Sequence, residues 1–306
     1  MRFTVSPATP DELTTACRVL AARPPEPERD GAALRFRDLL TGGELDPAGL
    51  FAARDEAGAV RGAMLVQALP GALGLAWPPR AERGKFQTAI EDALAAAACG
   101  WLRGRGVKVC QAFGPAAARA DAAAFGRHGF RLVTRVTHLR RAGGDGDRAF
   151  DPAAGPLAFE PFAPAARAEF AATLLATYHD SRDCPELTGT RTAAELLDGF
   201  RGPVTPGRDW WYLVRHAGDP VGVVLFDTGL EPGVLELNYL GLVPAARGRG
   251  WGDWLVRFAL GHAAADGSLA LNLSVDERNA PALRLYERHG FVEYDRRDVY
   301  LAAWPG

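Results

Sequence analysis

A loop rich in glycine and arginine stands between a predicted strand, residues 235–242, and a predicted helix that ends near Asp266-Gly267. The loop reads Arg247-Gly248-Arg249-Gly250-Trp251-Gly252. The first N–H groups of a helix have no intrahelical partner, and the helix dipole favours negative charge there. Glycines at alternate positions let a diphosphate approach the backbone without meeting a Cβ. The sequence therefore leaves two interpretations, an anion cradle or a plain glycine turn.

A second motif follows the loop. A strand is predicted over 269–275, and a helix opens at Asn279-Ala280-Pro281-Ala282, continues through Leu285-Tyr286 and ends at Gly290-Phe291. The two motifs resemble those of the GNAT superfamily of acetyl-CoA-dependent N-acyltransferases. The first family pattern, Arg/Gln-x-x-Gly-x-Gly/Ala, is matched by Arg247, Gly250 and Gly252. The second, Asn-x-x-Ala…Leu-Tyr-x-x-x-Gly-Phe, is matched by Asn279, Ala282, Leu285, Tyr286, Gly290 and Phe291. The resemblance covers the second half of the chain and favours the cradle.

The resemblance implies acetyl-CoA as cosubstrate, no metal, and direct acetyl transfer to a primary amine in a ternary complex. Loop amides would hold the pyrophosphate, with Arg247 and Arg249 either near the phosphates or solvated. In this family the strand ending at Leu242 splays from the strand around Leu273, which frees the Leu242 N–H for the thioester carbonyl. Asn279 either caps its own helix or contacts the cofactor. The predicted cofactor-binding residues are Leu242, Val243, Arg247, Gly248, Arg249, Gly250, Trp251, Gly252, Asn279 and Tyr286.

Tyr286, Glu236 and Leu242 are the predicted catalytic residues. Tyr286 would be the general acid, because a phenol with a pKa of about 10 can protonate a departing thiolate; the alternative is a core tyrosine among apolar neighbours. Some family members carry a glutamate base at the strand position of Glu236, and burial would raise its pKa towards neutrality. The alternative is an exposed strand glutamate. Strand alternation predicts that Glu236, Asn238 and Leu240 share one face.

The polar segment 179–186 lies between the first two predicted helices of the second half, where family members place substrate contacts. Asp180, Asp183 and Glu186 are predicted to receive a cationic amine there, together with Asn238; the alternative is a solvated loop. Cys184 lies in the same segment, but nothing in the sequence lowers its pKa, so we do not predict a nucleophile.

Composition describes an ordinary soluble protein. Of its 306 residues 48% are hydrophobic and 24% charged, with a formal net charge of −2. Dispersed arginines argue against nucleic-acid binding, and the sequence shows neither a signal core nor an apolar run long enough for a bilayer. The four widely spaced cysteines predict neither disulfides nor zinc, which favours a reducing cytoplasm. The expected partner is a small-molecule or peptide amine, and the expected state a monomer or homodimer.

The tetrapeptide Arg127-His128-Gly129-Phe130 recurs as Arg288-His289-Gly290-Phe291, at a predicted helix-to-strand junction in both halves. We interpret this as an internal duplication. The first copy is expected to be degenerate, with Phe86 and Thr88 at the positions of Gly250 and Gly252. The prediction is an α/β (α+β) protein of two tandem GNAT-like domains, 1–141 and 157–306, joined by a linker over 142–156. Each domain is a mixed, mostly antiparallel sheet flanked by helices.

Two other functions stay open. One is a CoA-binding regulator without turnover. The other is an acyltransferase for a longer acyl chain or for a protein N-terminus.

Overall fold

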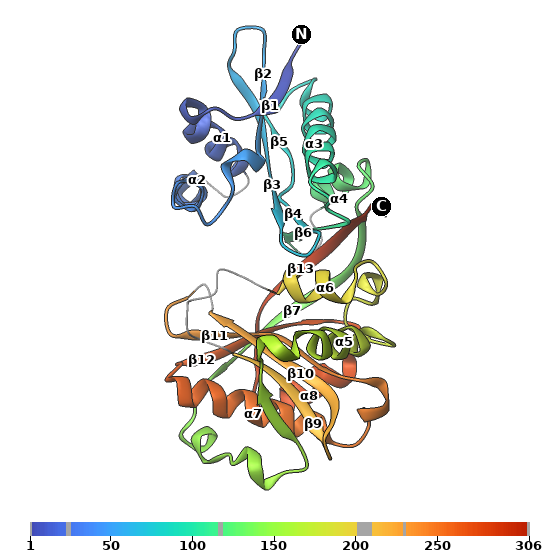
Figure 1. Ribbon diagram of the computed structural model, residues 1–306. Helices are drawn as coiled ribbons and strands as arrows, with labels where there is room; N and C mark the ends of the chain where they lie inside the picture. The colour runs from blue at the N-terminus through green and yellow to red at the C-terminus, as the bar shows by residue number, and fades with distance from the viewer. Residues whose placement is uncertain (1, 23–25, 116–118, 201–209, 229–230, 305–306) are drawn as a thin grey trace. The chain divides into compact units, whose positions relative to one another are not determined.

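The computed structural model describes residues 2–22, 26–115, 119–200, 210–228 and 231–304. The chain folds into two compact units. Unit 1 comprises Met1–Val133 together with Asp298–Gly306, and unit 2 comprises Thr134–Arg297. Each unit is a largely antiparallel sheet with helices packed on it (Figure 1), which confirms the predicted fold class. Within the described ranges we find no helix with the length and apolarity needed to cross a membrane.

The sheet of unit 2 is built largely from strands of the second half of the chain. In spatial order its strands are β7 (Arg131–Ala142), β12 (Ala270–Asp276), β11 (Val234–Leu242), β10 (Asp219–Thr228), β9 (Trp211–His216) and β8 (Ala158–Pro161). All neighbours are antiparallel except β11 and β12, which are parallel. The strand β13 (Val292–Ala303) is the other neighbour of β7. The helices of unit 2 are α5 (Arg167–Tyr178), α6 (Ala193–Gly199), α7 (Trp251–Asp266) and α8 (Ala280–Arg288).

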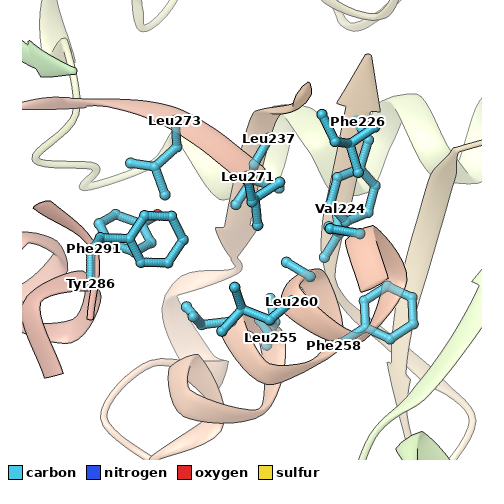
Figure 2. Close-up of a cluster of buried hydrophobic side chains, with 14 of the residues drawn as sticks. Val224, Phe226, Leu237, Leu255, Phe258, Leu260, Leu271, Leu273, Tyr286 and Phe291 are labelled. Atoms are coloured by element: carbon cyan, nitrogen blue, oxygen red, sulfur yellow. The ribbon is translucent and has the colours of Figure 1, made fainter. Parts of the chain in front are cut away.

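Apolar clusters cover both faces of this sheet. On one face, Leu255 and Phe258 of α7 pack against strand residues such as Val224 and Leu271, as Figure 2 shows. On the other face, α5 and α6 pack against β9, β10 and the later part of β11. Leu255 is fully buried, and truncating such a leucine to alanine costs about 2 to 5 kcal/mol. The core therefore fixes α7 against the strands that precede and follow it.

Unit 1 has the same kind of architecture. Its strands are β1 (Thr4–Pro7), β2 (Leu50–Arg54), β3 (Val60–Leu69), β4 (Leu73–Ala76), β5 (Arg80–Ala81) and β6 (Val109–Pro115), and its helices α1 (Leu13–Leu20), α2 (Glu26–Thr41), α3 (Gln87–Gly104) and α4 (Arg119–Gly126). The pair β4 and β6 is parallel, as β11 and β12 are in unit 2. The helix α3 packs on one face of the sheet and α1 on the other.

The two units share one ion-pair arrangement. In unit 1, Arg127 and His128 both contact Asp92 of α3, at 2.7 and 3.0 Å. In unit 2, Arg288 and His289 both contact Asp253 of α7, at 3.3 and 3.0 Å. Each of these residues lies 161 positions after its counterpart (289 − 128 = 253 − 92 = 161). Three coupled positions at one offset support the internal duplication more strongly than the tetrapeptide does.

The starts of the two helices bear on the predicted counterpart of the cradle. Phe86 is the N-cap of α3 and Gly250 is the N-cap of α7, so by place at the helix start Phe86 corresponds to Gly250 and Thr88 to Gly252, as predicted. Counted by the offset of 161, Gly250 and Gly252 correspond instead to Ala89 and Glu91. In either alignment the two residues of unit 1 carry a Cβ that Gly250 and Gly252 lack.

The segment predicted to be a linker, 142–156, packs on α7. The rings of Phe150 and Trp254 lie 5.2 Å apart, and a Cβ on Gly155 would meet the Trp254 ring at 2.5 Å. The chain passes from unit 1 to unit 2 within β7 and returns to unit 1 within β13, so Tyr300 and Ala302 belong to the core of unit 1. The boundaries at 141 and 157 stay a prediction about the two copies.

Candidate active site

The glycine loop has the geometry of an anion cradle. A short 3-10 turn, Pro244–Ala246, leads from β11 into the loop, and Gly248 and Gly250 have φ values of +74° and +76°. Gly250 is the N-cap of α7 without a side-chain hydrogen bond to that helix end, and a Cβ at either glycine would meet no described atom within 4 Å. The space beside these two glycines is therefore open, and the helix start that they border suits a negatively charged phosphate group.

Gly252 also has a packing role, and its predicted role in cofactor binding stays a prediction. It lies inside the first turn of α7, and a Cβ there would meet Cδ2 of Leu285 at 3.0 Å. This glycine therefore lets α7 and α8 approach each other. It brings the cradle and Tyr286, which neighbours Leu285 on α8, into one rigid assembly.

The guanidinium of Arg247 donates hydrogen bonds to three backbone carbonyls. Its Nε donates to the Leu242 carbonyl at 3.0 Å, and its two terminal nitrogens donate to the carbonyls of Asp180 and Thr177 at 3.0 and 2.9 Å. The guanidinium ties the end of β11 to the end of α5, which argues against its predicted place beside phosphates. Arg249 is exposed, and its guanidinium carbon lies 5.2 Å from the Trp251 ring centroid.

The sheet opens beside Leu242. The parallel pairing of β11 with β12 runs from Val234 opposite Ala270 to Leu237 opposite Leu273 and ends there, as predicted. Beyond that point β11 continues to Leu242 in register with β10. Since the next residue, Val243, donates its N–H to Val221 at 2.9 Å, alternation turns the Leu242 N–H away from β10. It faces the opening between β11 and β12, where a carbonyl oxygen could accept from it.

A bulge at Asn238 changes which β11 residues share a face. The register shifts there, with Leu225 opposite Tyr239 but Phe226 opposite Leu237. Leu237 and Leu240 both contact the cluster beneath α7, while Tyr239 packs on the α5 side. The prediction that Glu236, Asn238 and Leu240 share a face was therefore wrong for Leu240, because a bulge inverts the alternation that follows it.

Tyr286 lies at the edge of the core. It is 8% exposed, and its ring packs edge-on to Phe291 with 5.6 Å between the centroids. Burial, and secondarily the charge of Asp183, raise its pKa. The phenol therefore keeps its proton at neutral pH, as a general acid must. Its counterpart Phe125, 161 residues earlier, also packs on a phenylalanine: the rings of Phe125 and Phe130 are tilted by 45°, with 5.0 Å between the centroids.

The segment after α5 is clasped onto the end of β12. The Cys184 N–H donates to Asp276 Oδ2 at 3.0 Å, and the Asp276 N–H donates to Asp183 Oδ1 at 3.2 Å. Arg278 holds Glu186 through two hydrogen bonds of 2.7 and 2.9 Å, and its guanidinium also reaches Asp276. Burial raises the pKa of Asp183 to about 6. The Asp183 carboxylate thus lies at the end of the splayed strand.

The four predicted substrate-binding residues separate in the structure. Asp183 lies in the clasp and lowers the acidity of Tyr286, whereas Glu186 is occupied by Arg278. Asp180 is exposed with its carbonyl bound to Arg247, and Asn238 is exposed with its amide 3.4 Å from Asp227 Oδ2. Of the four, Asp183 alone lies next to the predicted acid. Asn279 caps α8 through Ala282 N–H at 3.4 Å and also bonds to Asp183.

One group in the described chain has the donor types of a metal site. Ligand atoms of Asp183, Cys184 and Asp276 lie within 4.8 Å of one another. Asp276 is fully buried, and its two carboxylate oxygens accept from Thr134, Arg278 and the Cys184 N–H. Burial raises the pKa of the Cys184 thiol, which disfavours the thiolate that a metal would need. These donors serve the clasp.

Glu236 lies away from Tyr286, on the sheet face opposite α7. Burial raises its pKa, while a hydrogen bond from Asn272 and the charge of Arg140 act against that rise. Our sequence reasoning missed Asn272, Arg140, Asp276 and Arg278. One signal was available: Asn272 interrupts the apolar strand Ala270-Leu271-Asn272-Leu273, and a buried amide in such a strand must have hydrogen-bond partners.

The fold and the geometry at the end of β11 point to a class of protein, the acyltransferases: two parallel strands part beside the glycine-capped start of a helix. Within that class, residues 174–291 match the family model described as Acetyltransferase (GNAT) family. This part of the chain belongs to the GNAT family.

Similar proteins agree with that assignment. A mycothiol acetyltransferase of Thermomonospora curvata is 46% identical over 94 residues, 31% of each chain, and one of Corynebacterium glutamicum strain R is 42% identical over 70 residues, 23% of this chain and 24% of the relative. The matches thus span under a third of these relatives' length. A GCN5-related N-acetyltransferase from Sphaerobacter thermophilus has the same fold over 98% of this chain and 95% of its own, with a TM-score of 0.58 and 19% identity. A tandem GNAT protein from the clavulanic acid biosynthesis pathway aligns over 99% and 98%, with a TM-score of 0.50 and 18% identity.

Proposed function

We propose that the chain is an N-acetyltransferase that moves an acetyl group from acetyl-CoA to a primary amine, with unit 2 as the catalytic unit. The observation that carries the proposal is the pairing of two features at the end of β11. A left-handed glycine is the N-cap of α7, and the strands β11 and β12 part beside it. Acetyl-CoA, when bound, supplies a pair of linked phosphates and an acyl thioester. The helix start suits the phosphates, and the gap between the strands suits the thioester.

Each residue then has one task in a direct transfer. The amides at the start of α7 hold the phosphates, and the Leu242 N–H stabilises the charge that develops on the carbonyl oxygen. Glu236 accepts a proton from the ammonium form of the substrate, so that the neutral nitrogen can form the N–C bond. The C–S bond breaks as that bond forms, and Tyr286 donates its proton to the sulfur. The new amide nitrogen then releases its remaining extra proton to solvent, and Tyr286 regains a proton from solvent.

The acceptor is proposed to be a small-molecule amine. The relatives named above are called mycothiol acetyltransferases, so a deacetylated form of mycothiol is the first acceptor to test. Simple amines of different size and charge, together with a peptide, form the rest of the panel.

The test has two parts. Calorimetric titration with acetyl-CoA should show binding, and thiol release with the amine panel should show turnover that depends on the amine. Binding without thiol release from any amine would favour a CoA-binding regulator. Release that is faster with a longer acyl-CoA, or with the peptide than with small amines, would favour the other acyltransferases considered above.

A further inference from the structure

A row of polar side chains crosses the sheet of unit 2. The register places Asp227 of β10 opposite Glu236 of β11, Glu236 opposite Asn272 of β12, and Asn272 opposite Arg140 of β7. Residues directly opposite each other point to the same face. The flanking residues, such as Leu237 and Leu273, contact the cluster beneath α7, so this polar row lies on the other face.

Asn272 is the centre of the polar row. It is 6% exposed, and its Oδ1 accepts from Arg140 Nε at 2.9 Å, while its Nδ2 lies 3.5 Å from the Tyr294 hydroxyl and its side chain bonds to Glu236. A guanidinium can only donate. The amide oxygen must therefore face Arg140, and the amide NH₂ is turned towards Glu236 and Tyr294.

Arg140 is held on two further sides. One terminal nitrogen donates to Glu231 Oε1 at 2.7 Å, and the guanidinium carbon lies 4.9 Å from the centroid of the half-exposed Tyr294 ring. A cation held by a carboxylate and a ring face keeps its Nε directed at Asn272. The orientation of one buried amide thus depends on a residue that has no catalytic task.

We propose that Arg140 and Asn272 are positioning residues for Glu236: Arg140 fixes the orientation of the Asn272 amide, and the amide then directs and stabilises the Glu236 carboxylate as the base. This inference rests on the proposed function, in which Glu236 takes the proton of the amine.

The groups around Glu236 set the direction of the expected effects. Burial and the carboxylates of Asp227 and Glu231, from β10 and the turn that follows it, raise the pKa of Glu236. Asn272 of β12 and Arg140 of β7 lower it, and Tyr294 of β13 is a further titratable neighbour. Removing either lowering group therefore raises the pKa further.

The first test needs no turnover. The carboxyl carbon of Glu236 is titrated by ¹³C NMR in the full chain, with Glu236→Gln to assign the signal. Asn272→Asp places a second carboxylate beside Glu236, and Arg140→Met removes the cation and releases the amide. Each should raise the pKa of Glu236 by about one unit. Arg140→Lys keeps a cation that can only donate hydrogen bonds, so the pKa of Glu236 in this variant should lie close to the wild-type value.

Arg296→Met is the matched control, because this arginine also lies on a strand of unit 2 but pairs with Glu293. It should leave the titration of Glu236 unchanged. A Glu236 pKa that is the same in Asn272→Asp, Arg140→Met and the wild type would overturn the proposal. So would an equal shift in Arg296→Met.

The second test is the pH dependence of kcat/KM for the amine. The acid limb should move up by about one pH unit in Asn272→Asp and Arg140→Met, a loss of about tenfold below that limb, with acetyl-CoA affinity unchanged. If the variants are active and the acid limb of kcat/KM stays at its wild-type pH, Arg140 and Asn272 are not positioning residues, and the proposed function is unaffected. Absence of transfer to any amine would overturn the proposed function, and the NMR titration would still decide the positioning.

Discussion

Tyr286 and Asp183 are the two ionisable groups whose burial matters most at the open end of the sheet. Both pKa values are raised by burial, that of Asp183 to about 6. A phenol that stays protonated beside a carboxyl group that titrates near neutrality can donate a proton and have it replaced. The chemistry at this scale depends on burial, which comes from the packing of α8 and the clasped segment.

Tyr286→Phe tests the acid. We expect kcat for acetyl transfer to fall at least about 100-fold, the usual contribution of a positioned acid, while the calorimetric Kd for acetyl-CoA changes little. Tyr300→Phe removes a hydroxyl from another buried tyrosine, in the core of unit 1, and should leave kcat unchanged. Wild-type turnover in Tyr286→Phe would remove the acid from the mechanism.

Asp183→Asn tests the buried carboxylate through stability. Because the folded-state pKa of Asp183 lies above its unfolded value of about 3.9, the native state binds the extra proton between these values and loses stability as pH rises through 6. Asparagine retains an acceptor for the Asp276 N–H and carries no charge. Urea unfolding should therefore show the variant more stable than wild type by about 1 to 3 kcal/mol at pH 7.5, with the difference vanishing near pH 4. A difference independent of pH would contradict the assignment.

At the scale of elements, the position of α7 depends on the glycine loop before it and on α8, which packs against it. The loop places the helix start at the opening of the sheet, and Gly252 lets α8 approach. The glycine loop and Tyr286 are therefore carried by two helices that pack against each other.

Gly252→Val tests this packing. A branched side chain at this position overlaps Leu285, and overpacking of this kind costs about 1 to 3 kcal/mol. In a double-mutant cycle, Leu285→Ala should recover part of that loss, as measured by thermal or urea unfolding. Additive effects of the two substitutions would mean that the helices do not meet at this glycine.

Local patterns predicted the elements that carry strong signals. The glycine loop and the helix that follows it were expected, and both are present. The sequence of α2, which begins Glu-Pro-Glu-Arg, has no clear apolar stripe from which that helix could have been predicted. The bulge at Asn238 was also missed, since nothing in Glu236-Leu237-Asn238-Tyr239 announces a change of face.

Long-range partners explain the remaining differences at the site. Arg247 bonds to carbonyls 67 and 70 residues away, and Glu186 to an arginine 92 residues away. Charged loop residues look available in sequence, and only the fold shows which of them are occupied. Asn272 and Arg140, 132 residues apart, meet for the same reason.

At the scale of the whole molecule, the two units share one scaffold, and one difference between them lies at the starts of α3 and α7. Both retain an Asp–Arg–His cluster and an aromatic pair at an offset of 161 residues. The N-cap of α7 in unit 2 is the left-handed Gly250, whereas the N-cap of α3 in unit 1 is Phe86. The duplication therefore predicts one coenzyme site per chain, in unit 2.

The most direct measurement is calorimetric titration of acetyl-CoA into wild type, Gly250→Glu and Gly267→Glu. Both glycines have positive φ and open surroundings, at opposite ends of α7, so the two variants carry similar backbone strain. We predict one site per chain in wild type and in Gly267→Glu, and no binding in a folded Gly250→Glu, where bulk and negative charge meet the phosphates. Two sites per chain, or undiminished affinity in Gly250→Glu, would contradict the account.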